Sequence, residues 1–156
     1  MESFYITKEG LEKLKSQLDF LMKVKRREIT EALSHARGFG DLAENAEYHA
    51  AKDAQSINEA RVRELSEKLA AARIMDDNAI DKEKITLGCT AVLKDLAYDE
   101  ELEYALVSDI EADFDKNKIS VSSPVGRGLI GKKVDEIAEI KVPAGVLRYQ
   151  VLKIVR

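Results

Sequence analysis

The chain has one cysteine, two histidines, two prolines and no tryptophan in its 156 residues. A single cysteine cannot form an intramolecular disulfide, and so few Cys and His residues cannot form a zinc cluster. We expect Cys89 to be a small buried apolar residue in a strand. No apolar run approaches membrane-spanning length, and the N-terminal Met1–Ile6 segment lacks the regions of a signal peptide. The chain therefore reads as cytoplasmic, without a membrane partner.

The chain also lacks a large excess of either charge, with 25 Lys and Arg residues against 29 Asp and Glu residues. The formal net charge is −4, although 35% of the residues are charged and 45% are apolar. This balance is typical of a globular protein with a long solvated helical surface, and it argues against a general nucleic-acid binder, which needs a basic face. The length suits one ordinary domain or two small ones and is too short for a large enzyme with its own deep cleft.

Composition changes near Asp76–Asn78. The preceding residues are rich in Ala, Leu, Glu and Lys and contain no proline, whereas short Val-, Ile- and Tyr-rich segments alternate with turn residues afterwards. We therefore predict an α+β protein of two domains, residues 1–77 and 78–156.

In the first domain, leucines are spaced by three, four and three residues. This stripe of Leu11, Leu14, Leu18 and Leu21 is typical of a coiled coil. Thr7 is a suitable N-cap, Gly38 a suitable C-cap, and a second helix is predicted from Asp41. Each helix has roughly 30 residues and a length of about 45 Å. A turn of only about three residues forces an antiparallel coiled-coil hairpin.

The second domain is predicted to be a small antiparallel sheet. Five strands are expected, at Thr86–Leu93, Leu102–Ser108, Lys118–Ser122, Glu136–Val142 and Val146–Val155. Pro143–Gly145 is a hairpin turn between the last two strands. Ser123 followed by Pro124 predicts a short helix over Val125–Ile130.

Asp41 and Glu44 lie at the turn of the hairpin. An Asp at a helix start with a Glu three residues later is a capping-box pattern, so helix capping is one interpretation. Their place at the far tip favours another. Two carboxylates alone cannot complete the roughly six oxygen ligands that Mg²⁺ requires. They could instead share an ion with another protein, as a two-metal mechanism requires.

Other polar residues surround the same tip. Arg37 and Lys52 flank the turn on the two helices and could steer a phosphate toward the carboxylates, although most such side chains are merely solvated. Tyr48 lies one turn after Glu44, and we expect it to pack against the first helix.

Four stretches of the sequence carry a family resemblance: Gly40–Lys52 and Leu18–Leu21 in the first domain, and Glu111–Phe114 and Ile119–Lys132 in the second. They resemble the corresponding stretches of bacterial Gre-type transcript cleavage factors, the GreA branch in particular. The resemblance spans nearly the whole chain, and both of its domain boundaries agree with ours.

The resemblance implies a second domain of FKBP-like topology, without implying prolyl isomerisation, because the sequence shows no aromatic-lined pocket. It implies binding to RNA polymerase at its secondary channel. There the residues matching Asp41 and Glu44 help to hold a second Mg²⁺, which the isolated chain does not bind. The polymerase then hydrolyses backtracked RNA near its 3′ end.

The same resemblance assigns roles to further residues. Arg37 and Lys52 match a basic spot that guides RNA, although arginine often occupies the second position and grips phosphate with two hydrogen bonds. The residues implied to dock on polymerase are Asp113, Phe114, Ser122, Ser123 and Pro124.

Two other functions remain open at this stage. One is a polymerase inhibitor of the same shape that occupies the channel without stimulating cleavage. The other is a coiled-coil scaffold whose tip acids only cap a helix. The oligomeric state is also open, although the asymmetric rod favours a working monomer.

Overall fold

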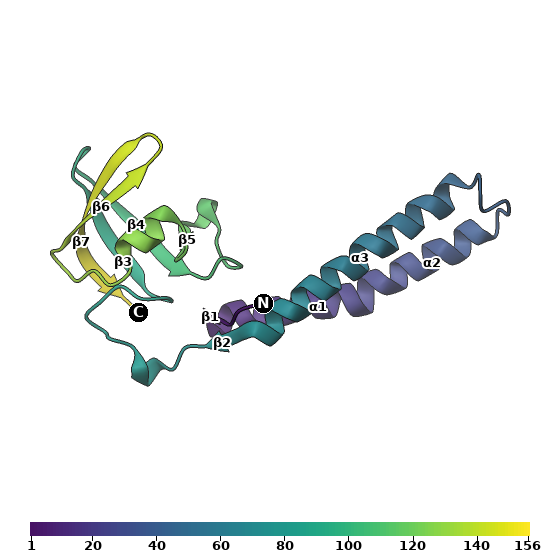
Figure 1. The fold of residues 1–156 in the computed structure, drawn as a ribbon, viewed down its shortest axis with the longest axis horizontal. Helices are drawn as coiled ribbons and strands as arrows, with labels where there is room; N and C mark the ends of the chain where they lie inside the picture. The colour runs from purple at the N-terminus through teal and green to yellow at the C-terminus, as the bar shows by residue number, and fades with distance from the viewer. The chain divides into compact units, whose positions relative to one another are not determined.

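The computed structural model describes residues 1–156, apart from the side chain of residue 77. The chain divides into two compact units. The hairpin unit comprises Met1–Ser3 and Leu11–Ala72, and the sheet unit comprises Phe4–Gly10 and Arg73–Arg156 (Figure 1). No helix in the described part of the chain is both long and apolar enough to cross a membrane.

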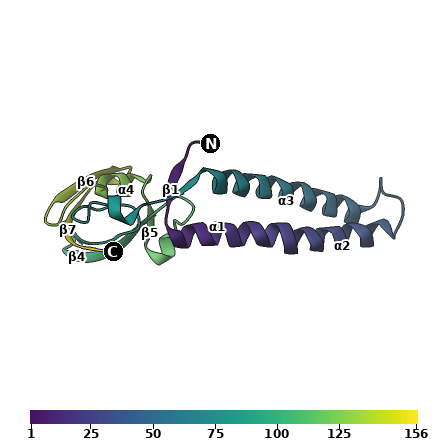
Figure 2. The same cartoon turned by 90° about the horizontal axis from the view of Figure 1, so that it is seen from below.

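The predicted helical hairpin is confirmed. Its two arms run antiparallel and are joined by a loop at one end (Figures 1 and 2). The helical segments are α1 (Lys8–Phe20), a π-helical turn (Leu21–Lys25), α2 (Arg26–Arg37) and α3 (Ala46–Ala71). Thr7 is the N-cap that the sequence predicts, because its hydroxyl oxygen accepts a hydrogen bond from the Gly10 amide at 3.0 Å.

Two details of the hairpin prediction are wrong. The second helix begins at Ala46 rather than Asp41, and the connection runs from Gly38 to Asn45 rather than over about three residues. The reason lies at Asn45, which caps the first turn of α3 in place of Asp41, since its side chain accepts a hydrogen bond from the Tyr48 amide. The residues before Asn45 are thereby left outside the helix.

The half of the hairpin near the loop has a small core of its own. Ile29 and Leu33 of α2 pack with Ala51 of α3, and the partly buried Tyr48 and Ala54 complete the cluster. Tyr48 therefore packs against the first arm, as predicted. Small alanines on α3 let the two helices approach closely at this point.

A buried polar contact fixes the two arms further from the loop. At the end of the π-helical turn, the Arg26 amide donates a hydrogen bond to the Leu21 carbonyl. The Asn58 side chain, which is only 5% exposed, donates to the same carbonyl at 3.2 Å. Next to it, Arg26 binds Glu59 through two hydrogen bonds of 2.7 Å. This hydrogen bonding lowers the pKa of Glu59. Such directional contacts favour one register of the arms over its neighbours.

The sheet unit contains five paired strands in the order β5-β4-β3-β7-β6. Their bounds are β3 (Thr90–Asp95), β4 (Glu100–Val107), β5 (Lys118–Ser120), β6 (Ile137–Val142) and β7 (Gly145–Val155). The prediction of a wholly antiparallel sheet needs one correction, because β5 pairs with β4 in parallel. A separate two-stranded sheet of β1 (Phe4–Ile6) and β2 (Ala72–Ile74) was not predicted.

The predicted turn and short helix are both present. Val142 pairs with Gly145 across the β6–β7 turn. Helix α4 (Pro124–Leu129) has Pro124 in its first turn and Ser123 as its N-cap. It contributes the fully buried Leu129 to the sheet core, together with Leu93, Leu106 and Val151. Cys89 is fully buried as predicted, although it precedes β3 rather than lying within it.

Tyr149 of β7 makes the stability of the sheet unit sensitive to alkaline pH. It is 5% exposed, and burial, with Tyr104 and Asp95 nearby, raises the pKa of its hydroxyl to about 12. Between pH 10 and 12 the folded state keeps a proton that the unfolded state loses, so stability falls as pH rises, by roughly 2–3 kcal/mol in total. We expect Tyr149→Phe to remove the part of this fall that comes from Tyr149. The measurement is the free energy of unfolding in urea at pH 9 and at pH 11.5, compared between the variant and the unchanged protein.

Tyr98 provides the matched control because its side chain is 75% exposed. Tyr98→Phe should leave the alkaline loss of stability as large as in the unchanged protein. An equal loss for Tyr149→Phe and the unchanged protein would contradict the assignment to Tyr149.

Candidate functional site

The end of the hairpin is an eight-residue segment, Gly38–Asn45, which we call the tip loop. Gly38 is the C-cap of α2, as predicted, and its amide donates to the His35 carbonyl at 3.1 Å. The Gly40 amide donates to the Arg37 carbonyl at 3.2 Å, which closes the last helical turn. The chain then leaves the helical direction at Gly40 and Asp41, whose φ angles are +69° and +42°.

Asp41 and Glu44 are both exposed in the tip loop. The Glu44 amide donates to the Asp41 carbonyl at 3.2 Å, so a single turn separates the two residues. Neither side chain caps α3, and the capping-box interpretation is therefore wrong. In the described part of the chain, no cationic side chain lies within 4 Å of either carboxylate. The carboxylates thus face solvent as available oxygen acceptors.

The backbone at Asp41 is unusual for a residue with a side chain. A positive φ is disfavoured by the Cβ atom, and Asp and Asn are the residues other than glycine that tolerate it best. Asp99, Asn117 and Asp135 in turns of the sheet unit share this conformation, so the positive φ identifies a tight turn and does not by itself mark a functional site.

Sequence reasoning missed the part played by Asn45. Its side-chain oxygen accepts from the Tyr48 amide at 3.0 Å, and its side-chain nitrogen donates to the Ala36 carbonyl at 2.7 Å. A longer contact of 3.4 Å reaches the Gly40 carbonyl. The available signal was the preference for Asn at N-caps, which the pattern of Asp41 and Glu44 obscured.

The predicted basic residues flank the tip loop from both arms. Arg37 is exposed at the last position of α2, and Lys52 is exposed on α3, where its amine donates to Gln55 at 3.3 Å. Two histidines complete the surroundings. The His49 Nε2 atom lies 3.0 Å from the Ala43 carbonyl oxygen. The rings of His35 and Phe39 pack edge to face, with their centroids 5.0 Å apart.

The tip loop offers oxygen ligands but not a complete metal site. Among the described residues, no group of three or more His, Cys, Asp or Glu side chains could hold an ion together. Two exposed carboxylates fit Mg²⁺ in ligand chemistry, since it prefers oxygen, but they fall short of about six ligands. The donor set thus fits an ion that is shared with other groups.

The residues predicted to dock on polymerase lie in the sheet unit. Asp113 caps a 3₁₀ turn, Phe114–Lys116, and the Phe114 side chain is 83% exposed. The Ser123 hydroxyl accepts from the Gly126 amide at 3.0 Å and donates to the Ser120 carbonyl at 2.7 Å. The loop before α4 is therefore held by its own hydrogen bonds.

Two residues that support this loop were not predicted. The hydroxyls of Ser120 and Ser122 both donate to the Asp109 carboxylate, and these bonds lower the pKa of Asp109. Arg127 donates through Nε to the Ser122 carbonyl at 2.6 Å. The signal in the sequence was weak, because Asp109 lies more than ten residues before the serines that it binds.

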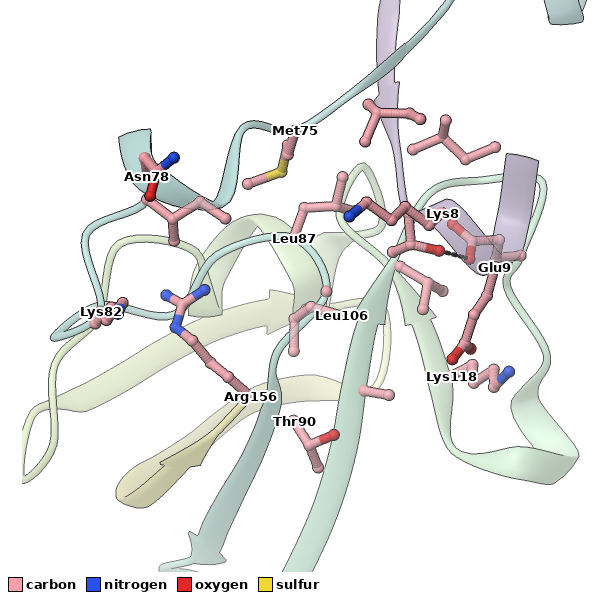
Figure 3. A pocket seen from close by; sticks show the side chains of 18 residues that line it. Lys8, Glu9, Met75, Asn78, Lys82, Leu87, Thr90, Leu106, Lys118 and Arg156 are labelled. Carbon is pink, nitrogen blue, oxygen red and sulfur yellow. Dashed lines mark hydrogen bonds between the residues drawn. The ribbon is translucent and has the colours of Figure 1, made fainter. Parts of the chain in front are cut away.

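The sheet unit also contains a cavity of about 780 Å³ (Figure 3). Lys8, Lys82 and Arg156 lie around it together with Leu87 and Leu106. The Arg156 guanidinium is already bound, with donor contacts of 2.8 Å to the Asp81 carbonyl and 2.9 Å to the Thr86 hydroxyl. None of the described residues that line the cavity is aromatic.

Comparison with known proteins gives matches over both parts of the chain. A family described as "Transcription elongation factor, N-terminal" matches residues 4–74. A second, described as "Transcription elongation factor, GreA/GreB, C-term", matches residues 80–156.

Individual relatives match over almost their whole length. The transcription elongation factor GreA of Chloroherpeton thalassium is 49% identical over 96% of this chain and 95% of its own. That of Clostridium botulinum (strain Kyoto) is 46% identical over 99% of this chain and 97% of its own. Among solved structures, the GreA factor homolog 1 (Gfh1) protein of Thermus thermophilus is 28% identical and covers 99% of this chain and 100% of its own, with a TM-score of 0.45. The sequence matches alone carry the conclusion: the chain belongs to the GreA/GreB family of transcription elongation factors, as its motifs predict.

Proposed function

We propose that this elongation factor donates the Asp41 and Glu44 carboxylates to a Mg²⁺ ion in the active centre of RNA polymerase and so stimulates cleavage of backtracked RNA. The observation that carries the proposal is the exposure of both side chains in the tip loop. Homology to GreA factors over nearly the whole chain supports the same function.

The length of the hairpin suits delivery into a channel. The first arm is helical from Lys8 to Arg37, and α3 runs from Ala46 to Ala71. At about 1.5 Å per residue, these arms are roughly 40–45 Å long. A rod of this length can carry two carboxylates from the surface of a large enzyme to a buried centre, which a compact domain cannot do.

The chemistry would belong to the polymerase. An ion held jointly by Asp41, Glu44 and polymerase groups would supply a water activated for attack on the RNA phosphodiester. Asp41 and Glu44 would act as ligands that orient this ion. The chain is then an accessory factor, and the catalytic machinery is complete only in the complex.

Arg37 and Lys52 would guide the RNA. Both are exposed and flank the tip loop from opposite arms, where their positive charges attract phosphate toward the acidic pair. Lys52 acts as a point charge and gives a less directional grip on phosphate than arginine does.

Docking on polymerase would use the sheet unit. The factor would act in the cytoplasm, and one copy of the chain would bind each polymerase. Asp113 and Phe114 offer one exposed contact, and Ser122, Ser123 and Pro124 offer an ordered loop. Aromatic side chains, phenylalanine included, are enriched in protein–protein interfaces relative to the rest of the surface.

We expect Phe114→Ala to weaken binding to RNA polymerase by about tenfold or more, because a large apolar side chain that would be buried on docking is lost. Its high exposure means that the free factor should keep its stability. Tyr98→Ala is the matched control, since that aromatic side chain is 75% exposed and outside the proposed docking residues. Titration of labelled factor with polymerase measures both affinities, and equal values would remove Phe114 from the docking surface.

A cleavage assay tests the proposed function. The factor is added to stalled, backtracked polymerase complexes with Mg²⁺, and the RNA is followed by electrophoresis. Shortened RNA that can be extended again supports the proposal. Blocked extension without cleavage would instead show an inhibitor that occupies the channel. If neither cleavage nor extension changes, the hairpin is a coiled-coil scaffold.

A further inference from the structure

One side chain joins both ends of the tip loop. Asn45 stands between the two arms, with its oxygen bound to the first turn of α3 and its nitrogen bound to the last turn of α2. The Ala36 carbonyl that it reaches belongs to a residue only 1% exposed, so this anchor is part of the packed end of the hairpin. The same nitrogen also approaches the Gly40 carbonyl at 3.4 Å.

The carboxylates lie in the segment that these contacts enclose. Asp41 follows Gly40 directly, and Glu44 precedes Asn45 directly, so the four residues from 41 to 44 form a loop with its ends held by one amide group. Within it, the Glu44 amide donates to the Asp41 carbonyl, and the His49 ring contacts the Ala43 carbonyl. An exposed loop of this length would otherwise have many conformations of similar energy.

We propose that Asn45 is a positioning residue, whose side-chain amide holds Asp41 and Glu44 at the spacing needed to bind one shared metal ion. This inference rests on the proposed function of the two carboxylates. Two ligands held in advance bind an ion more tightly than two mobile ones, because less conformational freedom is lost on binding. The side-chain oxygen of Asn45 caps α3, and its side-chain nitrogen anchors the tip loop to the last turn of α2.

The two roles of Asn45 can be separated by substitution. Asn45→Ser and Asn45→Asp both keep an oxygen that can cap α3, and both remove the nitrogen that donates to Ala36. Asp adds a negative charge beside the carboxylates, whereas Ser adds none. A shared effect of the two variants therefore reports the loss of the amide nitrogen that reaches Ala36 rather than the added charge.

The test measures RNA cleavage by backtracked polymerase complexes at saturating factor over a range of Mg²⁺ concentrations. Both variants should bind polymerase within about twofold of the unchanged protein and keep their thermal midpoint within a few degrees. The Mg²⁺ concentration for half-maximal cleavage should rise about fivefold or more. A residue that only caps α3 would leave this Mg²⁺ dependence unchanged, so an unshifted value in both variants overturns the inference.

Asp41→Asn, measured in the same assay, distinguishes the inference from the function on which it rests. If Asp41→Asn cleaves as well as the unchanged protein, the proposed function itself fails. If Asp41→Asn is inactive while Asn45→Ser and Asn45→Asp keep the normal Mg²⁺ dependence, only the positioning role fails.

Discussion

Asp41→Asn and Glu44→Gln should each abolish most stimulation of RNA cleavage, by on the order of a hundredfold, while polymerase binding stays within about twofold. Each change replaces a charged oxygen ligand by a neutral amide of nearly the same size, so the rod is kept and the ligand is lost. Asn is also the best substitute at Asp41 for a structural reason, since it tolerates the positive φ of +42° that this position requires. The measurements are the cleavage rate at saturating factor and the affinity for polymerase.

Glu47→Gln is the matched control for these variants. Glu47 is an exposed acid in the first turn of α3, close in sequence to the tip loop but outside it. Its substitution changes the net charge by the same amount and should leave cleavage near the normal rate. Loss of polymerase binding by Asp41→Asn would make the tip loop an affinity element and would refute the role of its carboxylates as metal ligands.

The hairpin could be predicted because its signals are local. Leucines at helical spacing, Thr7 before the first arm and Gly38 after it all act within a few residues of where they stand. The tip loop could not be predicted in the same way. Asp41 with Glu44 and Asn45 with Tyr48 are both acceptable starts for a helix, and the choice depends on the donor contact from Asn45 to Ala36 across the two arms.

The sheet shows the same division between local and distant signals. The β6–β7 turn at Pro143 and the cap of α4 at Ser123 were predicted from adjacent residues. The parallel pairing of β5 with β4 depends on which edge is free once the other strands have paired, and alternation of apolar residues carries no such information. That Asp41 and Glu44 lie at the end of the hairpin, by contrast, follows from the order of its two arms along the chain.

Gly126 is the second position at which a single substitution should have a large effect. It is buried in α4, where the helix backbone lies against the end of β5. A Cβ atom there would come within 2.0 Å of the Ser120 carbonyl oxygen and 2.9 Å of the Val121 Cα atom. Both neighbours are backbone atoms, and the Ser120 carbonyl also accepts from the Ser123 amide at 3.1 Å. A change of side-chain rotamer therefore cannot relieve the clash.

We expect Gly126→Ala to destabilise the sheet unit by about 3 kcal/mol or more, which lowers its thermal midpoint by on the order of 10 °C. Gly38→Ala is the matched control. Gly38 has a helical φ of −64°, and its added Cβ atom would meet only the His35 carbonyl at 3.2 Å, so a change within about 0.5 kcal/mol is expected. Thermal unfolding by circular dichroism compares the two variants. Because the Ser122–Pro124 loop depends on the same contact, Gly126→Ala should also weaken polymerase binding, and a stable variant with normal binding would contradict both statements.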